Sequence, residues 1–123
     1  MSKFATTKYG NKKVITKFPD HYVNLAITVD DTGITANADG KKIVPAGTII
    51  GNGILTDITK LAKKAVTTTG VSNAEGVLFE DVDVTYGPAS GALMIHGFVD
   101  LSKIPTAPTP EEITALKQIT FLK

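Results

Sequence analysis

The sequence contains no cysteine and no arginine: all 13 of its basic side chains are lysine. Without cysteine the chain can form no disulfide, thiolate zinc site or thiol nucleophile. Arginine is the usual side chain for bidentate contacts to phosphates and guanine edges, so its absence argues against a reader of nucleic acid. The formal net charge is only +1, which gives no overall field to attract nucleic acid or an acidic membrane. We therefore expect neither as a partner.

Long apolar runs are also missing. The stretch from Lys3 to Lys17 lacks the apolar segment of a signal peptide, and no run approaches the roughly 20 residues of a membrane-spanning helix. We therefore expect a soluble protein made in the cytoplasm. A chain of 123 residues is typical of one domain, and it can bury enough surface to fold without a metal or a disulfide.

Charge is distributed unevenly along the chain. Residues 1–19 contain five lysines and no acidic residue, whereas residues 65–102 contain five acidic residues and no lysine. Pro19 favours an extended conformation at Phe18, and the few large apolar groups of this stretch cannot offset its ordering entropy. We expect residues 1–20 to form a flexible basic arm, separate from a β-rich domain over 21–123. The arm is either a solvated tail or a segment that binds an acidic surface, including the acidic region of a neighbouring copy.

From residue 22 onwards the pattern is one of short strands separated by turns. Alternating apolar residues predict a strand over 22–29, and Asn37 to Gly40 predicts a tight turn after a brief extended piece at 34–36. Two β-branched stretches flank Pro45, which we expect at an edge or a corner. Further strands are predicted over 77–79, 82–86 and 92–101, and a last one over 119–122.

The segment 92–101 is the clearest of these strands. Strict alternation places Leu93, Ile95 and Val99 on one face and Met94, His96 and Phe98 on the other. Because both faces are largely apolar, we expect this strand to pack on two sides, either within its own core or against a second subunit.

Two segments have helical signals. Apolar residues at helical spacing predict a helix over 56–65, capped by Thr56 or Asp57. Thr109, Pro110 and Glu112 form the signature of a capping box that starts a second short helix. The whole pattern predicts a mainly β protein with one or two short helices, folded as a compact β barrel or sandwich-like domain.

Residues that could carry chemistry are few. His96 lies in a strand without a catalytic partner at a recognisable spacing, so we expect a hydrogen-bonded core or interface imidazole, and we expect His21 at the surface. Glu80, Asp81 and Asp83 lack the alternating ligands of a calcium loop. The glycines between residues 47 and 53 match neither a P-loop nor a dinucleotide motif, and we expect them to form bends. We therefore expect no catalytic, metal or cofactor site and no enzymatic activity.

The order of the elements nevertheless resembles a known family. A Val-Pro-Ala-Gly corner in 43–51 precedes Glu-Gly-Val-Leu at 75–78 and an Asp-Val-Asp strand at 81–83. The segment 92–99, a proline-rich connector, a short helix and a final strand follow. This succession is similar to the lambda-type head decoration proteins of tailed bacteriophages, from about residue 40 to the end.

The resemblance implies a homotrimer on the outer surface of the virion that stabilises the capsid. It also implies that the N-terminal arm contacts the major capsid protein by adding a strand to an exposed sheet edge. The arm residues to which we assign this contact are Tyr9, Lys12, Lys13, Val14, Ile15, Lys17 and Phe18.

Two alternatives stay open at this point. The first is another virion or surface binding module, such as the base of a head fibre or a carbohydrate-binding β domain. The second is a small enzyme on a β barrel, which would need His96 to meet Glu80 or Asp83 in a pocket.

Overall fold

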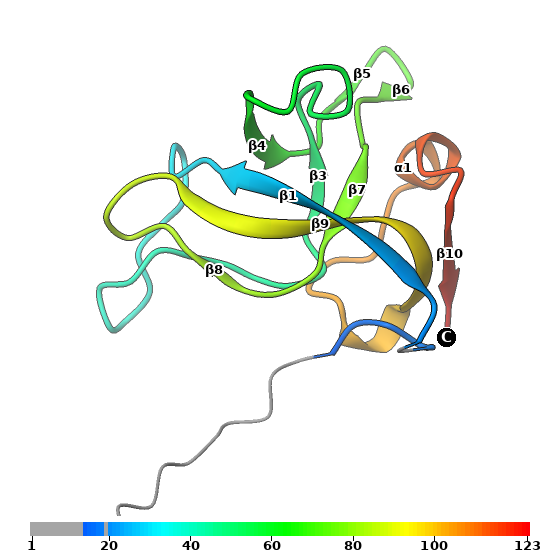
Figure 1. Ribbon diagram of the computed structural model, residues 1–123, viewed down its shortest axis with the longest axis horizontal. Coiled ribbons are helices and arrows are strands. Elements are labelled where there is room, and N and C mark those ends of the chain that lie inside the picture. Colours follow the sequence, from blue (N-terminus) through cyan, green and yellow to red (C-terminus); the bar gives the residue numbers. More distant parts are fainter. Residues whose placement is uncertain (1–13, 19) are drawn as a thin grey trace, which may run out of the picture.

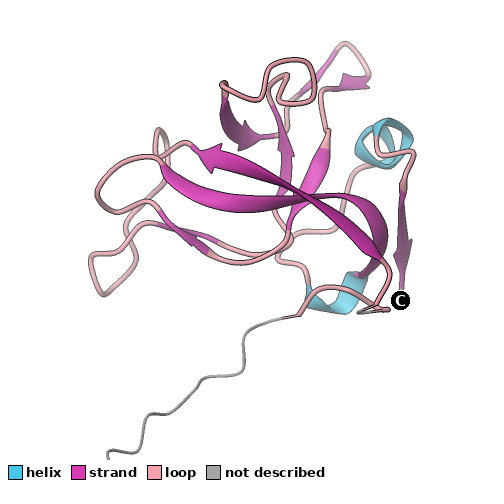
Figure 2. Cartoon of the chain, viewed as in Figure 1, coloured by secondary structure: helices cyan, strands magenta, loops and turns pink. Residues whose placement is uncertain are grey.

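The computed structural model describes residues 14–18 and 20–123 of the chain. The described part is mainly β, with one α-helix and one 3-10 turn, as the sequence predicts (Figures 1 and 2). Its elements are, in chain order, β1 (Tyr22–Val29), β2 (Ile43–Val44), β3 (Ile49–Gly51), β4 (Leu61–Lys64), β5 (Thr67–Thr68), β6 (Val71–Ser72), β7 (Gly76–Leu78), β8 (Val82–Asp83), β9 (Ala89–Asp100), the 3-10 turn (Leu101–Lys103), α1 (Pro110–Ala115) and β10 (Ile119–Leu122).

The main sheet closes on itself. Its strand order is β1-β4-β3-β7-β9-β10, and β1 also pairs with β9, so that five of the strands form a ring. Closure depends on the length of β9, which has 12 residues. Residues 89–97 of β9 pair antiparallel with β1 on one edge, Leu93 and Met94 pair antiparallel with β7 on the other, and the last four residues pair parallel with β10. The fold is therefore a small five-stranded β barrel with β10 as an extra edge strand.

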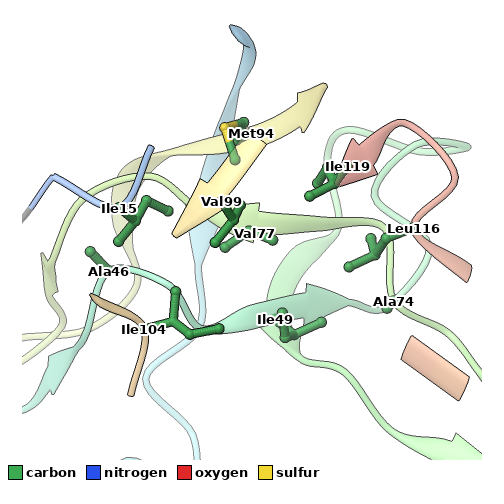
Figure 3. Packing of buried hydrophobic residues seen from close by; sticks show 10 residues of the cluster. All are labelled: Ile15, Ala46, Ile49, Ala74, Val77, Met94, Val99, Ile104, Leu116 and Ile119. Atoms are coloured by element: carbon green, nitrogen blue, oxygen red, sulfur yellow. The ribbon is translucent and has the colours of Figure 1, made fainter. Parts of the chain in front are cut away.

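Two layers of buried side chains hold this barrel together. One cluster takes at least one residue from each of the five ring strands, which identifies it as the barrel interior: Ile27, Val29, Val44, Ile50, Ile54, Ala62, Leu78, Val82, Val84 and Leu93. The other lies on the outer face of β3, β7 and β9, and is covered by the N-terminal segment, the connector after β9, α1 and β10 (Figure 3). Adjacent residues of β9, Leu93 and Met94, are both fully buried but belong to different clusters. The expectation that this strand packs on two sides is confirmed.

The predicted face assignment along β9 holds through Ile95, which packs against the cluster of Leu93, but it is wrong beyond that residue. Val99 belongs to the cluster of Met94 and not to that of Leu93. The cause is a bulge: Val23 pairs with His96 but Asn24 with Met94, so one extra residue of β9 shifts the alternation. The alternation of apolar residues in the sequence does not reveal the position of such a bulge.

The predicted helix over 56–65 is also wrong. Residues 54–60 form turns, in which the Asp57 carboxylate accepts hydrogen bonds from the backbone and hydroxyl of Thr59, and β4 follows. The carboxylate of Glu75 accepts hydrogen bonds from the backbone N–H groups of Ile54 and Leu55 at 2.6 and 3.0 Å. β4 then inserts between β1 and β3 and pairs with both. Pairing on two edges outweighs the local helical preference of this segment.

The second predicted helix is confirmed. The Thr109 side chain accepts a hydrogen bond from the Glu112 N–H, while the Glu112 carboxylate accepts one from the Thr109 N–H, which completes the capping box. The final strand also forms as predicted. Of the predicted strand over 82–86 only Val82 and Asp83 pair, and residues 34–36 form no strand.

The Pro45 corner separates β2 from β3 as expected, and Gly47 makes it possible. Gly47 has φ of +90°, and a Cβ atom there would lie 2.7 Å from Cγ2 of Ile104. The predicted turn before Gly40 also forms, with Gly40 at φ +75°, but nothing lies within 4 Å of a Cβ built at that position. At Gly47, both the backbone conformation and the packing require glycine, whereas at Gly40 only the backbone conformation does.

Candidate binding surface

The N-terminal segment of the described chain is part of the domain. Residues 15–17 run antiparallel to the end of β9: Thr16 lies opposite Val99, the Asp100 N–H donates to the Ile15 carbonyl at 2.7 Å, and the Lys17 N–H donates to the Phe98 carbonyl at 2.9 Å. The Ile15 side chain is 1% exposed and lies in the outer core cluster (Figure 3). The assignment of Ile15 to a partner contact is therefore corrected, because its side chain is already buried in its own domain.

Other residues of the predicted arm lie at the surface around this anchor. Val14 and Phe18 each leave 49% of their area exposed, and Lys17 is exposed as well. These three side chains lie at the N-terminal end of the described chain. Three of the predicted contact residues, Tyr9, Lys12 and Lys13, fall outside the described residues.

Aromatic side chains of β1 and β9 extend this surface. The Phe18 ring meets Phe98 edge to face at 5.2 Å between ring centroids, and His21 contacts Phe98 at 5.4 Å. Tyr22 is 41% exposed and contacts Phe79 at 4.7 Å. We call the exposed Phe18, His21 and Tyr22, together with the half-buried rings that they contact, Phe79 and Phe98, the aromatic face. Exposed aromatic groups that are fixed by neighbouring rings are typical of binding surfaces.

Sequence reasoning found only Phe18 among these five residues. His21 and Tyr22 lie at the start of β1. The apolar and aromatic residues there predict a strand, but they do not predict which of its side chains are exposed. Phe98 was expected to be buried on one face of β9. The signal that could have identified the aromatic face is that Tyr22 and Val23 are large adjacent residues at the open end of a strand.

The two histidines lie side by side within this surface. His21 Nε2 is 3.2 Å from His96 Nε2, and His96 Nδ1 is 3.0 Å from Gln118 Oε1. Because an amide oxygen can only accept, the contact with Gln118 requires a proton on His96 Nδ1, and the neutral form of that ring presents a lone pair at Nε2 to His21. His96 is half-buried and hydrogen-bonded, and His21 is exposed, as expected.

The acidic residues stabilise loops of their own chain. Hydrogen bonds from the side chain and backbone of Ser102 lower the pKa of Asp100, and those from Thr85 lower the pKa of Asp83 in the same way. Asp81 accepts from the Ala46 N–H at 2.6 Å. Within the described residues no three His, Cys, Asp or Glu side chains gather as a metal site, and the hydrogen bonds of His96 reach neither Glu80 nor Asp83.

A separate cavity of about 470 Å³ lies between the ends of β1 to β4 and the connector after β9. Most of its lining is apolar. It also contains Asp30, 6% exposed, whose carboxylate lies 3.6 Å from the Lys63 ammonium. Burial works to raise the pKa of Asp30, but hydrogen bonds from Thr32 and the charge of Lys63 outweigh it, so the pKa is lowered. No aromatic ring lines this cavity among the described residues, so it offers no platform on which a sugar could stack.

The outer edge of β10 is open in the described part of the chain. The Gly97 N–H donates to the Gln118 carbonyl, so the parallel ladder turns the even-numbered residues of β10 toward β9. The backbone N–H and C=O groups of Phe121 therefore face outward. Lys117 and Lys123 flank this edge. Residues 15–17 pair with the opposite edge of the same stretch of β9, so β9 separates them from β10. Figure 1 shows β10 at the C-terminal end of the chain.

Comparison with protein-family models, curated proteins and solved structures found no match to this chain. No helix within the described residues is long and apolar enough to cross a membrane.

Proposed function

We propose that this protein is a head decoration protein of a tailed bacteriophage. In this proposal it binds the outer surface of the capsid as a homotrimer and stabilises the shell. The major capsid protein is its partner, and the N-terminal segment with the aromatic face supplies the contact. It is not an enzyme, and it requires no cofactor.

The observation that carries the proposal is the anchoring of the basic N-terminal segment next to exposed apolar groups. Four of the first 13 residues are lysines, and this stretch leads directly into Val14 and Phe18 at the surface. The anchor at residues 15–17 is extended and is held by main-chain hydrogen bonds to β9. In this proposal, the residues that precede it in sequence bind the capsid. A segment presented in this way can add a strand to a sheet edge of another protein.

The arrangement of the segments that resemble decoration proteins supports the same proposal. The corner at 43–51, the Glu-Gly-Val-Leu stretch and the segment 92–99 contribute β3, β7 and β9, which are neighbours in the sheet. β10 follows as the next strand in that order. The corner at 43–51 also contributes β2, which pairs with β8 from the Asp-Val-Asp stretch in a separate two-stranded sheet. The segments that carry the resemblance thus form paired strands and not scattered surface pieces.

Trimer formation would raise the apparent affinity of a contact that is weak in a single copy. A single short segment that orders on binding loses much of its interaction energy to that ordering. Three linked segments on one trimer raise the apparent affinity by about 10² to 10⁴ when all can engage together. A trimer that bridges neighbouring capsid subunits would then oppose their separation.

The test is cosedimentation of the protein with expanded capsids that lack decoration. Deleting residues 2–13 keeps the Ile15 anchor, so the truncated protein should fold with the same unfolding midpoint but sediment poorly with capsids. Phe18→Ala should weaken capsid binding by about tenfold or more, because exposed aromatic residues often dominate contact energies. Val71→Ala is the matched control: Val71 is 70% exposed on β6, outside the proposed surface. Full binding by the truncated protein would refute the proposed role of the segment.

A further inference from the structure

The chain has only two histidines and no cysteine, and the fold brings both imidazoles together. His21 and His96 are 75 positions apart in sequence, yet their Nε2 atoms lie 3.2 Å from each other. His21 precedes β1 directly, and His96 pairs with Val23 at the bulge in β9. The pairing of β1 with β9, which closes the barrel, is therefore also what joins the two rings.

The spacing of the two nitrogen atoms suits a shared metal ion. Ligand nitrogens at about 2.0–2.1 Å from a tetrahedral zinc ion lie about 3.3–3.4 Å from each other. The observed 3.2 Å requires only a small rotation of either ring to reach that value. The rings are inclined by 52°, with centroids 5.1 Å apart, so they are not stacked face to face.

Gln118 prepares His96 for such a role. Its Oε1 atom accepts the Nδ1 proton of His96 at 3.0 Å, which fixes the tautomer that carries a lone pair on Nε2. A hydrogen bond of this kind at the remote ring nitrogen accompanies nearly every metal-binding histidine. Gln118 directly precedes β10, so the extra edge strand positions this partner.

The surroundings hold the second ligand in place and leave room for solvent. The backbone N–H of His21 donates to the backbone carbonyl of Phe18 at 3.1 Å, and the His21 ring packs against the Phe98 ring. His21 is exposed, so water can complete the coordination of an ion. No third protein ligand is provided by the described residues.

We propose that His21 and His96 form a binding site for a divalent transition-metal ion such as Zn²⁺ or Ni²⁺, with water in the remaining coordination positions. Neutral imidazoles favour this class of ion, whereas Ca²⁺ and Mg²⁺ prefer oxygen ligands. In the absence of metal, the His21 Nε2–H donates to His96 Nε2. When the metal binds, that proton is lost to solvent and Nδ1 of His21 takes up one proton in exchange, so His21 stays neutral and its Nε2 lone pair reaches the ion. The ion then links the start of β1 to β9. This inference revises the expectation of no metal site. It does not rest on the proposed capsid binding, although His21 also belongs to the aromatic face.

The experiment is a calorimetric titration of the full, untagged chain with ZnCl₂ and NiCl₂, combined with NMR of the two imidazoles. The expected result is saturable binding of one ion per chain in the micromolar range, with both histidine ring signals shifted. His21→Ala and His96→Ala should each weaken binding by at least about tenfold. Gln118→Ala should weaken it by about tenfold, near the lower end for loss of a hydrogen bond to a ligand. Thr120→Ala, an exposed change two residues further along, is the control that should leave the affinity unchanged.

Two outcomes would overturn the proposal. One is the absence of saturable binding up to millimolar metal. The other is binding that persists at the same affinity in the His21→Ala protein, which would place the ion elsewhere on the chain. Because His21 is exposed, His21→Ala should fold normally, so the test does not depend on the half-buried His96. Equal binding of Ca²⁺ would also contradict a site built from imidazoles.

Discussion

Replacing Ile15 with alanine tests how firmly the N-terminal segment belongs to the domain. The side chain is 1% exposed and packs in the outer core cluster, and its carbonyl accepts the Asp100 N–H. Its neighbour Val14 is 49% exposed. Val14→Ala is therefore a matched control that removes apolar atoms one position away without opening a cavity.

Truncation of a buried isoleucine to alanine costs about 2–5 kcal/mol, depending on how far the site can collapse. Two backbone hydrogen bonds join residues 15–17 to β9, so the segment can shift to fill part of the space that the missing Ile15 side chain leaves. We expect Ile15→Ala to lower the free energy of unfolding by about 3 kcal/mol. Val14→Ala should change it by less than about 0.5 kcal/mol, as is usual for an exposed position.

Urea denaturation followed by circular dichroism measures the difference. With an m value of about 1.5 kcal/mol/M, the midpoint of Ile15→Ala should fall by about 2 M. Amide exchange at Asp100 should accelerate in the same variant, because its N–H loses a firmly placed acceptor. A loss of stability no larger than that of Val14→Ala would refute the anchoring. It would mean that residue 15 belongs to an arm that does not pack on the domain.

Three further predictions concern the loops. Gly47→Ala should destabilise the protein by about 2–4 kcal/mol in urea denaturation, because it combines strain at positive φ with a steric overlap, whereas Gly40→Ala should cost only about 1 kcal/mol. Glu75→Ala should cost about 2 kcal/mol, because two backbone N–H groups lose a charged acceptor, and a neutral effect would contradict its role in the 54–60 turns. The pKa of Asp100 is lower when folded than when unfolded, so its contribution to stability is present above about pH 4 and is lost as the pH falls through the folded value. Ser102→Ala should raise that pKa in an NMR titration, and an unchanged value would be inconsistent with the proposed hydrogen bonds.

Local patterns predicted those elements whose signals lie within a few residues. The capping box at Thr109 and the alternation over 22–29 define their own elements, because the interactions that stabilise each start are neighbours in sequence. The Pro45 corner was predictable for the same reason.

The errors arose where distant pairing decides the outcome. The segment 61–64 has helical spacing, but the edges of β1 and β3 on either side of it favour a strand. Ile15 was assigned to a free arm because residues 1–20 do not show that they have a partner strand. That partner is the end of β9, which pairs with residues 15–17. The contact between His21 and His96 depends on the register of β1 against β9 and on its bulge. Neither register nor bulge can be read from composition or periodicity.

Reconstruction of decorated capsids by electron microscopy tests the proposed function most directly. Expanded capsids mixed with the protein should show three copies around each local three-fold position. Density continuous with the aromatic face should reach the major capsid protein through residues 1–13, and capsids mixed with the chain that lacks residues 2–13 should show none. Bare capsids at saturating protein, or copies bound in a number other than three, would contradict the account.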